Sequence, residues 1–207
     1  MNLRMLVAGL SAVAMLAACG KSESSKNTKA DSFQGEKVGV SEDSELALTE
    51  ETVSGTGSFV YKDPIGESSE DKSYVVSFKL ADKASLELRS HTNNKLSKGV
   101  NLRFTRDGKN VKLVYGGESE KPKTIELLKN VDESKNIELS IDVHNSETPS
   151  HVLVWSSSEA KKGEESALFN SDADVDTREK GTGVYWGFIL DNATLNSAKS
   201  GGPIFGH

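Results

Sequence analysis

The sequence predicts an all-β domain, a two-sheet antiparallel sandwich, preceded by a signal peptide and a flexible tether. Three observations support this fold class. Short stretches alternate apolar and polar residues, turn residues separate these stretches at close intervals, and almost nothing in the chain suggests a helix. Alternation with a period of two marks strands that have one buried and one wet face, which is typical of antiparallel sheets.

The clearest alternation lies between residues 74 and 143. It predicts strands near 74–80, 86–88, 100–105, 111–115, 125–127 and 137–143. Turn residues separate them, and the Asp107-Gly108 pair predicts a tight hairpin between two of the strongest strands. About ten short strands in total favour a sandwich or a barrel, and we prefer the sandwich.

Two later strands differ because they are apolar on both sides. They are expected at 152–155 and 184–190, and a final strand is expected at 193–200. A strand without a polar face should be central in the fold, or packed under a loop. The long polar stretch 156–183 separates the two.

The chain before the sandwich divides into a leader and a tether. Arg4 and the apolar run up to Ala18 predict a signal peptide at residues 1–18, and the run is too short for a comfortable membrane span. Residues 19–51 are very polar and predict a flexible linker, in which 41–51 is a short helical turn or an acidic lead-in. The sandwich is expected at 52–200, followed by a loose tail at 201–207.

The end of the leader carries a more specific motif. Leu16-Ala17-Ala18-Cys19 resembles the lipobox of bacterial lipoproteins, and Cys19 is the one cysteine of the chain. The resemblance implies lipidation of Cys19 and attachment to a membrane, where two or more acyl chains anchor stably. Gly20 stands where such lipoproteins carry Asp for inner-membrane retention, so the resemblance implies the outer membrane of a Gram-negative cell envelope.

The strand rhythm resembles a known class of sandwich. Long meandering strands followed by Trp-Gly-Phe-Ile-Leu-Asp-Asn-Ala-Thr-Leu at 186–195 are similar to the concanavalin A-like jelly roll of laminin G domains, lectins and glucanases. An immunoglobulin-like fold is the alternative, although the strand count is high for it. The concanavalin A-like resemblance implies sugar binding on a concave sheet or at a loop edge.

Composition and motifs argue against several functions. The net charge of −6 disfavours a nucleic-acid partner. The chain lacks Gly-x-Ser-x-Gly, histidines at metal-binding spacing and the Glu-x-Asp-x-x-Glu of concanavalin A-like glucanases; Glu138, Ser140 and Asp142 come nearest to that triple. We therefore expect no enzymatic activity and no cofactor, with a glycan hydrolase as the least favoured alternative.

One loop has the spacing of a cation site. Asp172, Asp174 and Asp176 alternate, as carboxylates do at the start of several calcium loops. However, Thr177 stands where an EF-hand needs glycine, and the distal Glu is missing. The alternatives are a calcium site and a solvated acidic loop.

The wet faces of neighbouring strands predict a binding surface. Its candidate residues are Arg89, His91, Asn101 and Arg103. Tyr61, Trp155, Tyr185 and Trp186 are the candidates for an aromatic platform, and the alternative for the two tryptophans is a place in the core. The resulting expectation is a lipid-anchored binding module whose partner is a glycan or an envelope protein. The alternative is a structural or assembly lipoprotein that docks onto another envelope protein.

Overall fold

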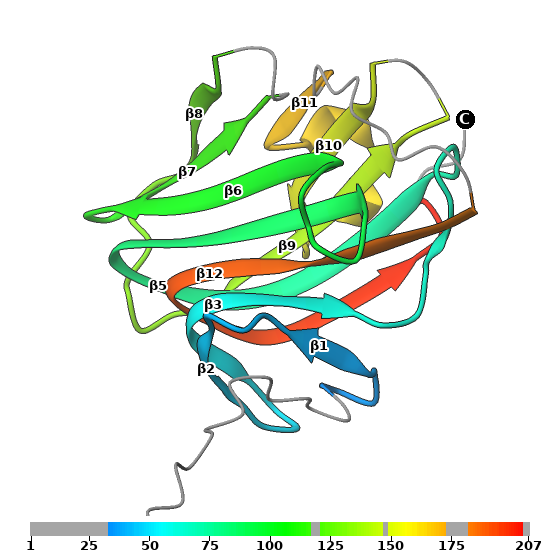
Figure 1. Cartoon of the computed structure of the whole chain (residues 1–207). Coiled ribbons are helices and arrows are strands. Elements are labelled where there is room, and N and C mark those ends of the chain that lie inside the picture. Colours follow the sequence, from blue (N-terminus) through cyan, green and yellow to red (C-terminus); the bar gives the residue numbers. More distant parts are fainter. Residues whose placement is uncertain (1–32, 117–120, 147–148, 173–181, 205–207) are drawn as a thin grey trace, which may run out of the picture.

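The computed structural model describes residues 33–116, 121–146, 149–172 and 182–204 (Figure 1). The described residues form twelve strands and two short 3-10 helices, and they contain no α-helix. Within these residues no helix is long and apolar enough to span a membrane. The all-β antiparallel architecture predicted from the alternation is confirmed.

The twelve strands follow one another with short connections. Those of the first half are β1 (Val38–Val40), β2 (Glu45–Leu48), β3 (Val53–Tyr61), β4 (Gly66–Glu67), β5 (Lys72–Thr92) and β6 (Val100–Asp107). Those of the second half are β7 (Asn110–Tyr115), β8 (Lys123–Leu128), β9 (Ile137–His144), β10 (His151–Ser156), β11 (Phe169–Asp172) and β12 (Thr182–Gly201). The helices η1 (Ala160–Lys162) and η2 (Glu164–Ser166) lie between β10 and β11.

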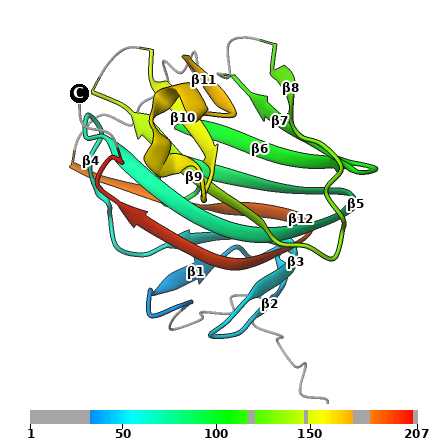
Figure 2. The ribbon, with the colours of Figure 1, turned by 180° about the vertical axis from the view of Figure 1, so that it is seen from behind.

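The two layers are one hydrogen-bonded sheet that folds over across three long strands (Figures 1 and 2). The front layer contains β8, β7, β6, residues 85–92 of β5, residues 182–191 of β12, residues 57–61 of β3, and β1. The back layer contains β11, β10, β9, residues 72–80 of β5, residues 193–201 of β12, residues 53–55 of β3, and β2. The sequence predicted four separate strands where β5 and β12 run through both layers.

Local backbone geometry explains the fold line. Lys83 and Asn192 have φ values of 63° and 52°, and Gly57 has 148°, so each long strand bends at a residue with positive φ. In the register, Asp191 pairs with Ser85 but Ala193 pairs with Leu80, so β5 carries extra residues at the bend. Extra residues of this kind bend a strand sharply. The three bends lie side by side and turn the sheet back on itself.

The core fills the space between the layers. The alternating apolar residues predicted to face inward are buried there, including Phe78, Leu88 and Phe104. Phe78 of the back layer meets Phe104 of the front layer with ring centroids 5.4 Å apart. Tyr61 stacks on Trp186 with ring centroids 3.9 Å apart, and Tyr74 lies 5.1 Å from the same indole. Burial raises the pKa of both tyrosines, so their hydroxyls stay protonated.

A second, smaller cluster lies outside the back layer. Leu153 and Trp155 are fully buried there against Ala160, with Ala167 and Ile204 packed beside them. The connection that contains η1 and η2 covers these side chains, and the Trp155 Nε1 donates a hydrogen bond to the Gly163 carbonyl over 3.1 Å (Figure 2). The prediction that the strand 152–155 packs under a loop is therefore confirmed.

Two predicted boundaries are wrong. The linker was expected to reach residue 51, but Phe33 and Val38 are 0% exposed, and β1 and β2 pair with β3. β1 and β2 each contain only a few apolar residues within a polar stretch, and this pattern is too short to predict a strand. The tail was expected to be loose from residue 201, but Ile204 packs against the back layer. Residues 1–32, including Cys19, lie outside the described residues.

Candidate functional site

The outer side of the front layer presents polar side chains from two central strands. Glu87 and Arg89 of β5 face outward, and the register pairs them with Arg103 and Asn101 of β6. Strand alternation places all four on the same side of the sheet. We call Glu87, Arg89, Asn101 and Arg103 the front polar group.

This group is held in place by pairing and partial burial. The Nε of Arg89 lies 2.5 Å from Oε1 of Glu87, and the two side chains are 17% and 13% exposed. The Nε–H does not point at the carboxylate, since it makes no hydrogen bond, so the contact is an ion pair. The Asn101 Oδ1 is buried and has no hydrogen-bond partner among the described residues. Arg103 is exposed.

A loop closes the front layer next to this group. Gly187 of β12 pairs with Arg89, and a Cβ at Gly187 would lie 2.3 Å from the Phe59 carbonyl oxygen and 3.0 Å from the Leu96 side chain. Leu96, at φ 55° and 6% exposed, therefore lies directly over Gly187. The carbonyl and amide groups of Asn93 fix this turn, since the Asn93 side chain bonds to Lys95 N and to Ser97.

A shallow pocket adjoins the loop. Its volume is about 190 Å³, and it lies between the loop residues 94–96 and the outer sides of β3 and β1. Val60 and Gly39 line it, and the register places Val60 next to Gly187. The pocket and the front polar group thus share one surface, with Leu96 between them.

The aromatic residues predicted to form a binding platform do not lie together on the surface. Trp155 and Trp186 are 0% and 1% exposed, so the platform expectation is wrong for both, and the core alternative is right. Trp186 packs between the layers and Trp155 packs in the cluster outside the back layer, so neither ring lies on the outer side of the front layer. Tyr185 faces outward from β12 and is half-buried, so it is the aromatic side chain that accompanies the front layer.

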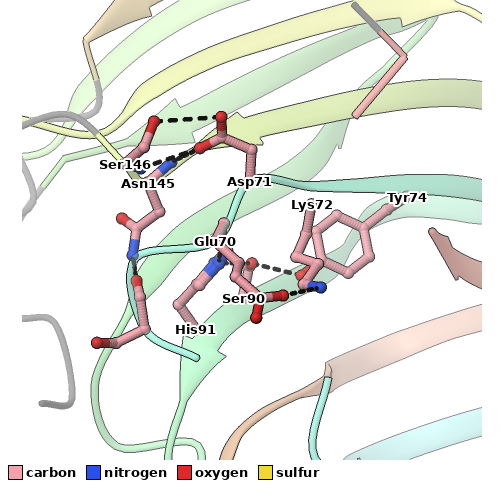
Figure 3. Close-up of polar contacts among 9 residues, drawn as sticks. Glu70, Asp71, Lys72, Tyr74, Ser90, His91, Asn145 and Ser146 are labelled. Carbon is pink, nitrogen blue, oxygen red and sulfur yellow. Dashed lines mark hydrogen bonds and ion pairs between the residues drawn. The ribbon is translucent and has the colours of Figure 1, made fainter. Parts of the chain in front are cut away.

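His91 does not lie on the wet face either. A φ of 50° turns its backbone, and its side chain is fully buried at one end of the sandwich (Figure 3). The Nδ1 lies 2.7 Å from the Ser90 Oγ, and the Nε2 lies 2.7 Å from the Glu70 carbonyl oxygen. Because a carbonyl only accepts, the Nε2 donates. The Ser90 hydroxyl also contacts the Tyr74 hydroxyl at 2.6 Å, so these residues form an interior chain of hydrogen bonds.

A second network ties the same end to the back layer (Figure 3). The Asp71 carboxylate accepts hydrogen bonds from the backbone N–H groups of Asn145 and Ser146, over 2.7 and 2.9 Å, and from the Ser146 hydroxyl over 3.2 Å. Burial acts to raise the Asp71 pKa, but these hydrogen bonds outweigh it and lower the pKa. The network holds the start of β5 against the end of β9 and serves the fold.

The C-terminal segment covers part of the outer side of the back layer, around Asp142 of β9. This carboxylate is fully buried, and both of its oxygens accept the Ile204 backbone N–H at 3.0 Å. The Ser73 hydroxyl donates to the Gly202 carbonyl over 2.6 Å. His144 lies 3.6 Å from Asp142 and is also buried. The C-terminal segment 202–204 therefore closes over Asp142, whereas Glu138 of the same strand stays exposed.

The predicted calcium loop is only partly described. Asp172 ends β11, where its backbone pairs with His151, while Asp174 and Asp176 lie outside the described residues. In the part of the chain that the structure describes, no three histidine, cysteine or acidic residues group as metal ligands. The calcium site stays a prediction.

Comparison with known proteins gives structural likeness alone. No family model matches the chain, and no curated protein matches its sequence. Among solved structures, the carbohydrate-binding module CBM66 from Bacillus subtilis is 12% identical over 84% of this chain and 91% of that one, with a TM-score of 0.47. The exoplasmic/lumenal domain of VIP36, in its Ca²⁺/Man3GlcNAc-bound form, is 14% identical over 78% and 83%, with a TM-score of 0.48.

A prokaryotic β-1,3-1,4-glucanase derived from a mouse hindgut metagenome is also similar. It is 11% identical over 76% of this chain and 83% of that chain, with a TM-score of 0.46.

Proposed function

We propose that this chain is a non-enzymatic, lipid-anchored binding module of a bacterial cell envelope, and that the outer side of its front layer binds a glycan. The observation behind the proposal is the front polar group: four polar side chains on two rigid central strands, beside a pocket, with hydrogen-bonding capacity unused inside the protein.

The chemistry of the group suits sugar hydroxyls. Hydroxyls both donate and accept, so they match a surface that offers carboxylate, amide and guanidinium groups together. A buried acceptor without a partner costs about 1–3 kcal/mol. A ligand hydroxyl removes this cost at Asn101 once its amide turns outward, which needs only rotation of the terminal torsion.

The rigidity of the front polar group and its loop favours ligand binding on the front layer. Arg89 is fixed by Glu87, and Leu96 is fixed over Gly187, so little side-chain entropy is lost when a ligand binds. Side chains on strands also hold their geometry better than side chains on loops. Tyr185 supplies a half-buried ring at the edge of the same surface.

Attachment to the membrane rests on the lipobox resemblance of Leu16-Ala17-Ala18-Cys19. A Cys19→Ala variant should lose lipid labelling and leave the membrane fraction. If that variant still fractionates with membranes, the anchor is wrong.

A glycan array tests the binding function. The full chain, solubilised in detergent, should bind at least one class of glycan on the array, and Asn101→Ala should weaken that binding by about 5–10-fold, the loss expected for one hydrogen bond. Ser77→Ala, a half-buried change on the outer side of the back layer, is the matched control. No binding by the intact chain, or equal loss in both variants, contradicts the proposal.

A further inference from the structure

The charge of the front layer differs from that of the whole chain. The chain has 31 acidic residues against 25 lysines and arginines. The centre of the front layer and its adjoining loop carry Arg89, Arg103 and Lys95, against Glu87 as the carboxylate among them. A local excess of positive charge in an acidic protein is a feature of the site rather than of the composition.

Three carboxylates on the outer side of the front layer form ion pairs with cations other than Arg103. Glu87 pairs with Arg89 at 2.5 Å, Asp107 with Lys112 at 2.6 Å, and Glu126 with Lys129 at 3.0 Å. Among the described residues, no ion pair or hydrogen bond involves the Arg103 guanidinium, although Glu87 stands opposite it in the register. The guanidinium of Arg103 is therefore exposed and uncompensated.

Among the described residues of the front-layer strands, Asp191 is the remaining carboxylate on the outer side, and it lies at the fold line. It stands two strands and one side-chain row away from Arg103. With strands 4.8 Å apart and rows about 7 Å apart, the separation is about 12 Å. That exceeds the Debye length of about 8 Å at physiological salt, so Asp191 does little to offset the charge of Arg103.

Guanidinium chemistry points to one kind of ligand group. The planar fork of an arginine matches a carboxylate through two parallel hydrogen bonds. Asn101 and Thr105 flank Arg103 on the same side of β6, where they can meet the hydroxyls of the same sugar. Lys95 is exposed and lines the neighbouring pocket, where it adds a second positive charge to the same surface.

We propose that the glycan bound by the front layer is acidic, and that Arg103 pairs with the carboxylate of a uronic acid unit. This inference rests on the proposed glycan-binding function and adds the chemical class of the ligand. Arg103 is then the residue that sets specificity for charge, while Asn101 serves acidic and neutral sugars alike.

Calorimetric titration of the full chain in detergent tests this inference. The probes are oligomers of galacturonate, mannuronate and glucuronate, each beside its carboxyl-reduced counterpart, which replaces the carboxylate by an alcohol and keeps the rest of the sugar. We expect at least one uronate oligomer to bind more tightly than its reduced form by about 10-fold or more, the value of one charge-assisted hydrogen-bonded pair.

Variants locate the effect. Arg103→Gln should abolish the difference in affinity between the acidic and the reduced oligomer, because it removes the guanidinium charge and keeps a polar side chain. Lys79→Gln removes a cation from the outer side of the back layer and is the control, with no change in affinity expected. Raising the salt concentration should weaken binding of the uronate more than binding of its reduced form.

The outcomes separate the two proposals. Equal affinity for acidic and reduced oligomers, with loss of both in Asn101→Ala, overturns the acidic ligand and supports glycan binding. Binding of neither oligomer, together with a blank glycan array, overturns both proposals. Equal loss in Arg103→Gln and Lys79→Gln overturns the assignment to Arg103.

Discussion

The outer sides of the two layers use polar side chains in opposite ways. On the back layer, Asp142 is fully buried and its two oxygens accept the Ile204 N–H, so its hydrogen bonds hold the chain terminus. On the front layer, Asn101 keeps an acceptor without a described partner, and Arg103 is exposed. Polar groups that are hydrogen-bonded within the protein stabilise the fold. Polar groups without such partners are available to bind a ligand.

The cover of the back layer should be the most costly to disturb. Trp155→Ala removes a fully buried ring and its hydrogen bond to Gly163, so the free energy of unfolding should fall by about 3–5 kcal/mol. Chemical denaturation measures the loss. Leu168→Ala, in the same segment but 37% exposed, should change stability by less than about 0.5 kcal/mol. Similar values for the two variants contradict the packing described for this cover.

A smaller loss is expected where Leu96 closes on the front layer. Gly187→Ala places a Cβ 2.3 Å from the Phe59 carbonyl oxygen, and a backbone atom cannot rotate away. Overpacking of this kind costs about 1–3 kcal/mol and should displace the Leu96 loop. Thermal unfolding of Gly187→Ala and of Gly202→Ala, which has open space around its Cβ, provides the comparison. Equal midpoints argue against the close contact.

The rim of the back layer should respond to pH. The pKa of Asp71 is lowered in the folded state, so its ionised form adds stability above the unfolded pKa of about 4 and loses it as pH falls through the folded value. Asp71→Asn should cost about 1 kcal/mol near pH 7, since a hydrogen bond to a charged acceptor becomes a neutral one. The difference from the parent chain should shrink between pH 5 and about pH 2. A difference independent of pH contradicts this role of the carboxylate.

The front polar group should matter least for stability. Arg103→Gln changes an exposed side chain that has no described ion pair, so unfolding should shift by less than about 0.5 kcal/mol. Thermal unfolding of the purified variant checks this. A larger loss of stability means that Arg103 stabilises the fold, and Arg103 would then no longer be assigned as a ligand-binding residue of the front layer.

Much of the architecture could be predicted because alternation in this chain follows burial. Strand β6 illustrates this, since Val100, Leu102 and Phe104 are buried while Arg103 is exposed. The length of β5 and β12 could not be predicted, because their bends depend on positive φ at Lys83 and Asn192. Lysine rarely adopts positive φ, and asparagine adopts it more often but mostly in turns, so neither residue predicts a bend inside a strand. The edge strands β1 and β2 were missed since they are only three and four residues long and lie within an otherwise polar stretch.

The candidate site was predicted in part. Arg89, Asn101 and Arg103 were expected together and lie together, because neighbouring strands with simple alternation place their odd residues on one side. His91 was misplaced because a positive φ reverses its side chain, an effect that pattern alone does not reveal. Leu96 and Gly187 carried no functional signal in the sequence, since their contact joins a loop to a strand about ninety residues later.

Amide chemical shifts give the most direct test of the ligand-binding front layer. The Cys19→Ser chain, which lacks the acylation site, would be titrated with the tightest-binding uronate oligomer. We expect shifts at Glu87, Arg89, Asn101 and Arg103 and in the loop 94–96, with the amide signals of Glu138, Lys199 and Ile204 unchanged. Shifts confined to Glu138, Lys199 and Ile204 would place the ligand on the back layer and rule out the front layer as the binding surface.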